Sequence, residues 1–236
     1  PLDAAPPIEA ASPFAGVFAH IEVQTGTAEL PVFGADRVVQ RGYSRWTITS
    51  DGEALQVESE TCGVEIERET DLVRTELPQR FIDALPHTFR PAQVEGARFV
   101  APTFVEVRAA ALDDPENDPL PTMADDPRVI DLDTDGHPGL TVRISGLLDG
   151  DVYVVQRTRT ALEGTLDGDR LDGRLVWRNE ESILGADNPA LLTGAPVEPD
   201  PDPAAHYFRS TRVDPVIDCP AIIANAGALF ARTGVR

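Results

Sequence analysis

The chain has 236 residues, of which 40 are acidic and 20 basic, so its net charge is −20 and its pI is near 4.4. With 42% apolar residues, a chain of this length can bury a substantial core, which excludes disorder throughout. All the basic residues are arginines, and no basic run exceeds two residues, so nucleic acid and anionic membranes are excluded as favoured partners and cations are better candidates. No apolar run approaches the roughly 20 residues of a transmembrane helix.

The first residues, Pro1-Leu2-Asp3-Ala4-Ala5-Pro6-Pro7, resemble a linker that remains after a signal peptide or lipid anchor is removed. We expect a flexible linker at residues 1–13 and one β-rich domain at residues 14–236. The protein is then exported from a bacterium, as a periplasmic protein, an outer-membrane-anchored lipoprotein or an extracellular protein.

Short runs of β-branched and aromatic residues, separated by Asp-Gly or Gly-Asp pairs, predict antiparallel hairpins. The first hairpin turns at Asp51-Gly52. A two-residue turn there places Ile48 opposite Leu55 on an apolar face and Arg45 opposite Glu58 on the other face. Further strands are expected at residues 14–23, 36–40, 99–107 and 206–213.

The apolar positions change face by Cys62, which predicts a bulge or break at residues 61–63. Neither Cys62 nor Cys219 belongs to a Cys-x-x-Cys pair, so zinc and dithiol redox sites have no support. We predict a disulfide between these two cysteines, with two free buried thiols as the alternative. Such a bond closes a long loop and ties the C-terminal segment to the first third of the fold.

Helical patterns are confined to two short segments. One covers residues 79–85 after Pro78, and the other covers residues 221–232, where Pro220 suits the first helical turn. Two proline- and aspartate-rich stretches are expected to be loops, at residues 113–128 and 185–205.

The sharpest motif is the D-x-D-x-D-G sequence of Asp131, Asp133, Asp135 and Gly136. Carboxylates at alternate positions can converge on one hard cation once the glycine permits a sharp turn, and the carbonyl of His137 is a further oxygen ligand. The sequence therefore predicts a calcium site, with a tight acidic turn that binds no metal as the alternative.

The motif resembles EF-hand loops over about nine residues, and it is more similar to the D-x-D-x-D-G loops of integrin-type and other extracellular β proteins, where the loop leads directly into a strand. Val142 stands where an EF-hand has its bidentate glutamate, and Gly139 stands where the extracellular loops often have a final acid. An ion then needs a distant ligand such as Asp126, Asp149 or Asp151, or water.

Two more hairpins follow. The turn at Asp149-Gly150 joins residues 140–147 to residues 152–160, with a register that stays open between a two-residue and a three-residue loop. The turn at Gly168-Asp169 pairs Leu166 with Leu171 and Gly164 with Gly173. A glycine pair across two strands suits a tightly curved barrel.

These elements predict a mainly β protein: a single antiparallel β-barrel or a strongly bent β-sandwich with one or two short helices. Trp46, Phe104 and Trp177 are candidates to line a ligand cavity in such a barrel, with ordinary core filling as the alternative. The meander of hairpins, the Gly16-Val17-Phe18 start and a C-terminal cysteine able to bond an early strand resemble lipocalin-type barrels. That resemblance implies a ligand inside the barrel.

We therefore expect a non-enzymatic, exported binding protein for a small apolar ligand or a protein surface partner, stabilised by calcium. The motifs of serine hydrolases, zinc proteases and phosphate-binding loops are missing from the sequence. One alternative is a structural or adhesive module of the cell envelope, which lacks an internal cavity. The other is a carboxylate- or metal-dependent hydrolase, with acids of raised pKa in a cleft.

Overall fold

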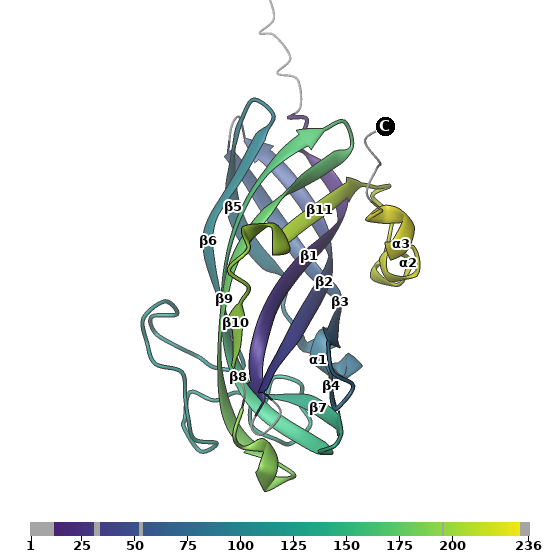
Figure 1. Ribbon diagram of the computed structural model, residues 1–236. Helices are drawn as coiled ribbons and strands as arrows, with labels where there is room; N and C mark the ends of the chain where they lie inside the picture. The colour runs from purple at the N-terminus through teal and green to yellow at the C-terminus, as the bar shows by residue number, and fades with distance from the viewer. Residues whose placement is uncertain (1–11, 31–33, 52–53, 195, 232–236) are drawn as a thin grey trace, which may run out of the picture.

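A computed structural model describes residues 12–30, 34–51, 54–194 and 196–231 (Figure 1). Most of the expected linker at residues 1–13 and Gly52 of the first expected turn lie outside the described residues.

Eight antiparallel strands close into a ring (Figure 1). Each ring strand pairs with the next ring strand along the chain, and the last pairs with the first. This up-and-down order confirms the predicted mainly β, antiparallel, barrel-like fold. The ring strands are β1 (Gly16–Leu30), β2 (Gly34–Asp51), β3 (Ala54–Arg68), β5 (Thr88–Glu95), β6 (Arg98–Arg108), β8 (Gly150–Asp167), β9 (Arg170–Ala186) and β11 (Tyr207–Arg212).

Three short strands extend the wall at the lower end in Figure 1. β7 (Leu140–Gly146) pairs with the first residues of β8, β4 (Val73–Glu76) pairs with β7, and β10 (Val197–Pro199) pairs with β1. The barrel is therefore long, and its lower wall uses segments from the connections between the ring strands.

The hairpins test the predicted registers. Between β8 and β9, Leu166 faces Leu171 and Gly164 faces Gly173, as predicted. Between β2 and β3 the predicted register is wrong by two residues, since Ile48 faces Val57. The faces are nevertheless correct, because a shift of two residues leaves every side chain on its own face.

The hairpin of β7 and β8 has neither of the two registers considered. Ile144 pairs with Gly150, so five residues form the loop, and Val142 faces Val152. The predicted bulge near Cys62 is confirmed, because the β2–β3 register shifts where Tyr43 pairs with Gly63 and Ser44 with Thr61.

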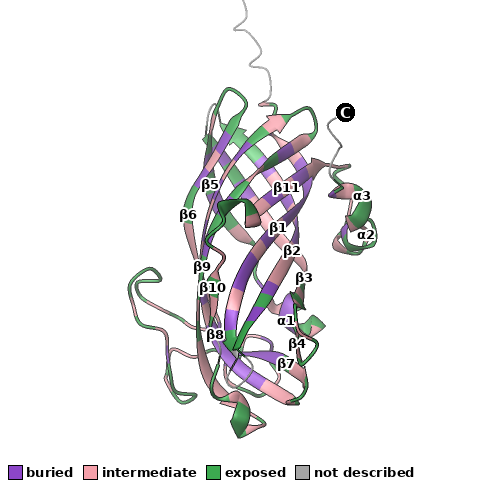
Figure 2. Ribbon diagram, in the orientation of Figure 1, coloured by how far each residue is buried: buried purple, intermediate pink, exposed green. Residues whose placement is uncertain are grey.

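Buried and accessible side chains alternate along the ring strands (Figure 2). Aromatic and aliphatic side chains fill the upper end of the barrel, which carries the β5–β6 and β8–β9 turns. Phe208 packs over the glycine pair there: a Cβ atom at Gly164 or Gly173 would come within 2.6 Å of its ring. Other buried members of this cluster are Phe14, Phe18, Trp46, Phe99, Leu162 and Leu175.

Both expected helical segments are present, and the second one is broken at Asn225. The helices are α1 (Gln79–Ala84), α2 (Cys219–Ala224) and α3 (Ala226–Leu229), with 3-10 turns η1 (Pro189–Leu191) and η2 (Pro203–Ala205). Ile222 and Phe230 cover the apolar outer face of β1. None of the described helices has the length and hydropathy needed to cross a bilayer.

The predicted disulfide between Cys62 and Cys219 is formed, with a Cα–Cα distance of 4.8 Å. It ties α2 to β3 across a sequence separation of 157 residues. Residues 113–128 form a loop, as expected. The second expected loop is only partly irregular, since residues 185–205 also contain the end of β9, η1, β10 and η2.

Candidate ligand cavity and aspartate loop

A cavity of about 450 Å³ lies inside the barrel below the aromatic core. Its volume falls in the range of small-molecule sites, roughly 300–1,000 Å³. The lining changes character along the barrel axis. Near the core it is polar, and toward the lower end it is aliphatic. The cavity therefore offers two different environments to one molecule.

The aliphatic half comes from the strands of the lower wall and from the loops below it. Val142 and Ile144 project from β7, Val154 from β8 and Ile183 from β9. Leu147, in the β7–β8 loop, also lines the cavity and is 57% exposed. Since a lining residue reaches solvent there, the cavity opens at the lower end.

The polar half holds ion pairs that face inward. Arg108 donates two hydrogen bonds to the carboxylate of Glu106, at 2.9 and 2.8 Å, and both side chains line the cavity. Glu22, on β1, also lines it and lies 3.4 Å from Nε2 of the buried His20. Charged groups so far inside a barrel are costly unless they are paired.

Arg90 is a buried cation of β5, with 5% of its surface exposed. Its guanidinium donates hydrogen bonds to the Oγ1 and carbonyl oxygen of Thr160 and to the carbonyl oxygen of Pro102, and it lies over the ring of Phe104. Among the described residues its Nε atom has no hydrogen-bond partner. Burial lowers the pKa of Arg90, and the nearby carboxylate of Glu22 acts in the opposite direction.

Glu181 differs from the other two glutamates of the cavity. Its Oε2 accepts a hydrogen bond of 2.8 Å from Nε2 of Gln156, a neutral group, and its side chain belongs to none of the ion pairs among the described residues. Burial raises the pKa of this carboxyl group, and the bond from Gln156 offsets only part of that shift. The Glu181 side chain is exposed, and because it lines the cavity, solvent reaches it from the cavity.

His20 and Glu22 show how burial and hydrogen bonding compete. Burial lowers the pKa of His20, whose Nδ1 lies 2.8 Å from the hydroxyl of Ser210 and whose ring stacks on Trp46. Burial alone would raise the pKa of Glu22, but the hydrogen bond and charge of His20 leave it below its usual value. Glu22 is thereby held as a carboxylate.

The predicted ligand-binding residues Trp46, Phe104 and Trp177 all line this cavity. Trp177 Nε1 donates to Nδ1 of His206 at 3.0 Å, which fixes the indole against the wall. The charged lining of the cavity was not predicted from the sequence. Strand alternation could have indicated it: Glu181 lies four residues after Trp177 and is therefore on the same face of the strand.

The aspartate loop lies outside the barrel, next to α1 and the start of β7. Carboxylate oxygens of Asp131, Asp133 and Asp135 lie within 4.8 Å of one another. Thr134 and Gly136 have φ values of 53° and 90°, so the chain turns sharply enough to bring them together.

Most oxygens of the cluster already accept hydrogen bonds. Asp131 accepts from the backbone N–H groups of residues 135 and 136, and Asp135 accepts from the hydroxyl of Thr141 at 2.6 Å. Asp133 is the exception: its side chain is 0% exposed, and its Oδ1 has no partner among the described residues. A buried carboxylate oxygen without a partner is energetically costly and favours a cation nearby.

The other predicted ligands lie elsewhere. Asp126 pairs with Arg128, and Asp151 pairs with Arg143, while Asp149 accepts from the backbone of Gly146. The ring of His137 stacks on Tyr153 at 4.2 Å, and its carbonyl as a ligand stays a prediction.

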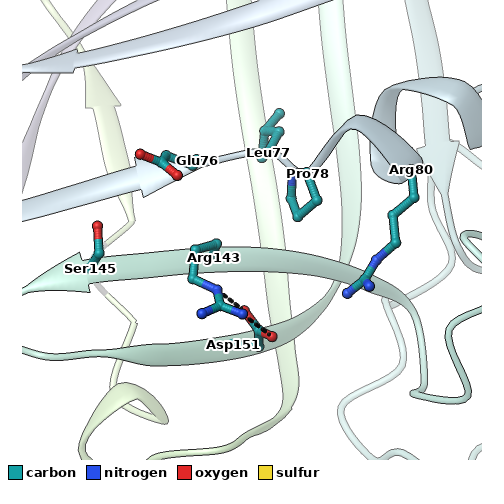
Figure 3. Close-up of a pocket in the computed structure, with 7 residues that line it drawn as sticks. All are labelled: Glu76, Leu77, Pro78, Arg80, Arg143, Ser145 and Asp151. Atoms are coloured by element: carbon teal, nitrogen blue, oxygen red, sulfur yellow. Dashed lines mark hydrogen bonds and ion pairs between the residues drawn. The ribbon is translucent and has the colours of Figure 1, made fainter.

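A groove of about 500 Å³ on the outer surface adjoins this loop (Figure 3). It is lined by residues of β4, α1, β7 and β8, and the Arg143–Asp151 pair crosses it. Arg80 borders the groove and reaches the aspartates, with Nη2 2.8 Å from Asp135 Oδ2 and Nε 3.6 Å from Asp133 Oδ2. The loop therefore already holds one cationic side chain.

No family model, curated protein or solved structure matches this chain in the three comparisons made. The site must therefore be understood from its own geometry.

Proposed function

We propose that this protein is a binding protein that holds one small, largely apolar molecule inside its barrel. The observation that carries the proposal is the cavity of about 450 Å³, aliphatic at its open end and polar at its inner end. An apolar molecule gains roughly 25 cal/mol for each Å² removed from water. The inner polar groups then fix its orientation.

The strand order supports this proposal. The ring strands follow one another in chain order, which is the topology implied by the resemblance to lipocalins, and those barrels hold small apolar molecules. The cavity also favours a binding protein over an adhesive module, for which a filled interior is expected. The disulfide suits an oxidising compartment, so we propose an exported bacterial protein.

The hydrolase alternative needs a catalytic partner for an acid of raised pKa. Glu181 has the raised pKa, but its side-chain hydrogen-bond partner among the described residues is the amide of Gln156. An amide orients the carboxyl group without acting as a second acid or base. Binding is therefore the function that these contacts support best.

The variant Ile144→Trp tests the proposal, because the larger side chain projects into the aliphatic half of the cavity. We expect binding of the apolar fluorophore N-phenyl-1-naphthylamine to weaken at least about tenfold, since the ligand loses its space. Fluorescence titration measures this directly, and both tryptophans of the protein line the cavity and give a second signal.

The matched control is Ser145→Trp, which adds the same side chain to the next residue of β7, on the side of the outer groove. This variant should bind the fluorophore as the wild type does. Equal affinity of wild type and a folded Ile144→Trp variant would contradict the proposal.

We further propose that the aspartate loop binds calcium as a stabilising ion. Three converging carboxylates and the partnerless Asp133 Oδ1 support this proposal. Asp131, Asp133 and Asp135 would supply the oxygen ligands, and Arg80 would compete with the ion for the same charges. A loop short of one acid is expected to bind weakly, with a Kd of roughly 0.1–1 mM.

Thermal unfolding in calcium, with magnesium as the comparison, tests the ion site. Calcium at ten times its Kd should add about 1.4 kcal/mol to the unfolding free energy. The variant Asp133→Asn should lose that response, because an amide is a weaker ligand than a carboxylate. An identical melting temperature with calcium and with magnesium would remove the support for calcium.

A further inference from the structure

The charges on the cavity wall say more about the ligand, on the premise of the proposed binding function. Among the described residues, six charged side chains line the cavity: Glu22, Glu106, Glu181, Arg68, Arg90 and Arg108. Arg68 is paired with Asp36, and the other five belong to the polar half. A charged group without an ion-pair partner affects which ligand binds, because an opposite charge on the ligand can pair with it.

Both arginines of the polar half are already engaged, Arg108 by a carboxylate and Arg90 by neutral acceptors near two glutamates. Arg108 is held by two hydrogen bonds to Glu106, and its charge is cancelled there. Arg90 is held by the carbonyl oxygens of Thr160 and Pro102 and feels the negative charges of Glu22 and Glu106. A ligand anion would have to displace one of these arrangements to gain an arginine.

Glu181 is the charged group of the polar half that has neither an ion-pair partner nor a nearby opposite charge among the described residues. Its only side-chain hydrogen bond among the described residues comes from the neutral Gln156. When it is ionised, the polar half carries one excess negative charge. A cationic group on the ligand would supply the partner that the wall does not.

The surroundings of Glu181 suit an ammonium group attached to an apolar body. Trp177, Asn179, Glu181 and Ile183 alternate along β9, and all four line the cavity. The amide of Asn179 thus lies next to the carboxyl group on this face, and the indole of Trp177 lies further toward the aromatic core. Ile183 lies on the other side and begins the aliphatic half that leads to the open end.

We infer that the ligand is an amphipathic amine, whose ammonium group pairs with Glu181 and whose apolar chain lies along the aliphatic half toward the open end. The cation enters first, and the chain fills the space between β7, β8 and β9.

Three ligands with the same ten-carbon chain test this inference: decylamine and decanoate, each below its micelle concentration, and decanol, below its solubility limit. Isothermal titration calorimetry compares wild type with Glu181→Gln. A net charge of −20 attracts any cation to the outer surface, so the titrations are run in 0.3 M NaCl, where the Debye length is below about 8 Å.

We expect the wild type to bind decylamine at least about tenfold more tightly than decanoate, and Glu181→Gln to lose this preference while its affinity for decanol is unchanged. The control Glu95→Gln removes the same charge from a side chain that is 86% exposed, and it should keep the preference.

Decanoate binding as tight as decylamine binding, or an amine preference that survives Glu181→Gln, would overturn the inference and leave the proposed function standing. If none of the three ligands binds, the proposed function fails as well.

Discussion

Glu181 lines the cavity of the barrel, and it is the residue proposed to bind the charged group of the ligand. Its carboxyl group lies on the inner wall and is exposed, and its one side-chain hydrogen bond among the described residues comes from the amide of Gln156. A binding protein keeps such a group at a cost in stability when the ligand supplies the missing partner. In the same way, Asp133 Oδ1 has no hydrogen-bond partner among the described residues, and a metal ion would supply a partner.

The pKa shift of Glu181 leads to a prediction for the ligand-free protein. Its raised pKa means that the folded state holds the proton to higher pH than the unfolded state does. Its contribution is therefore most favourable below about pH 4.5, the ordinary value, and is lost as the pH rises through the folded pKa. Glu181→Gln cannot ionise and should melt slightly higher than wild type at neutral pH, by less than a buried group would give, because solvent screens an exposed carboxylate.

Thermal unfolding from pH 4 to pH 8 measures this difference, which should shrink toward zero at the acidic end. Glu95→Gln serves again as the control, because its exposed side chain should give no such trend. A melting temperature of Glu181→Gln that lies below the wild type at neutral pH would show that the carboxylate stabilises the fold.

At the scale of elements, β5 shows why the rule of apolar-in and polar-out can mislead. In this strand Phe89 is 57% exposed on the outside, whereas Arg90 is buried on the inside. The alternation is reversed only at this pair, since Ala92 is buried and Val94 packs against the core while Gln93 and Glu95 are exposed. No strand is predicted from the sequence at residues 88–95. β4 and β10, with four and three residues, are too short for any period to be recognised.

The disulfide is the link between the C-terminal helices and the barrel. Replacing both cysteines, Cys62→Ser with Cys219→Ser, should lower the unfolding free energy by about 2–5 kcal/mol, because the unfolded chain is no longer closed into a long loop. Urea denaturation measures the loss, and wild type treated with a reductant should show the same midpoint. An unchanged midpoint in both samples would mean that Ile222 and Phe230 hold the helices without the bond.

At the scale of the whole molecule, the two ends of the barrel are packed differently. The upper end is a packed aromatic core over a glycine pair, and a second cluster of buried, mainly aliphatic side chains joins α1 to the lower wall. The lower end is widened by β4, β7 and β10, and it encloses the cavity. The net charge of −20 adds a long-range attraction for cations, in the same sense as the excess charge at Glu181.

The features predicted correctly are local ones: antiparallel strands, the register of the Leu166–Leu171 hairpin, both helical segments and the grouping of three aspartates. The sequence also selected Trp46, Phe104 and Trp177, because large aromatic residues at alternating positions belong inside a barrel. Turn chemistry and side-chain alternation act over a few residues, so one sequence is enough to read them.

Which charges face one another inside the barrel depends on how the strands are assembled. Glu22, Arg90, Glu106 and Glu181 come from four strands, of which β5 and β6 are consecutive, and each reads as an ordinary surface charge in its own strand. Ring closure turns these strands to a common interior. The pKa of a charged group and its interaction energy depend on its exposure to solvent and on its neighbours. Both are properties of the assembled barrel and not of any local segment.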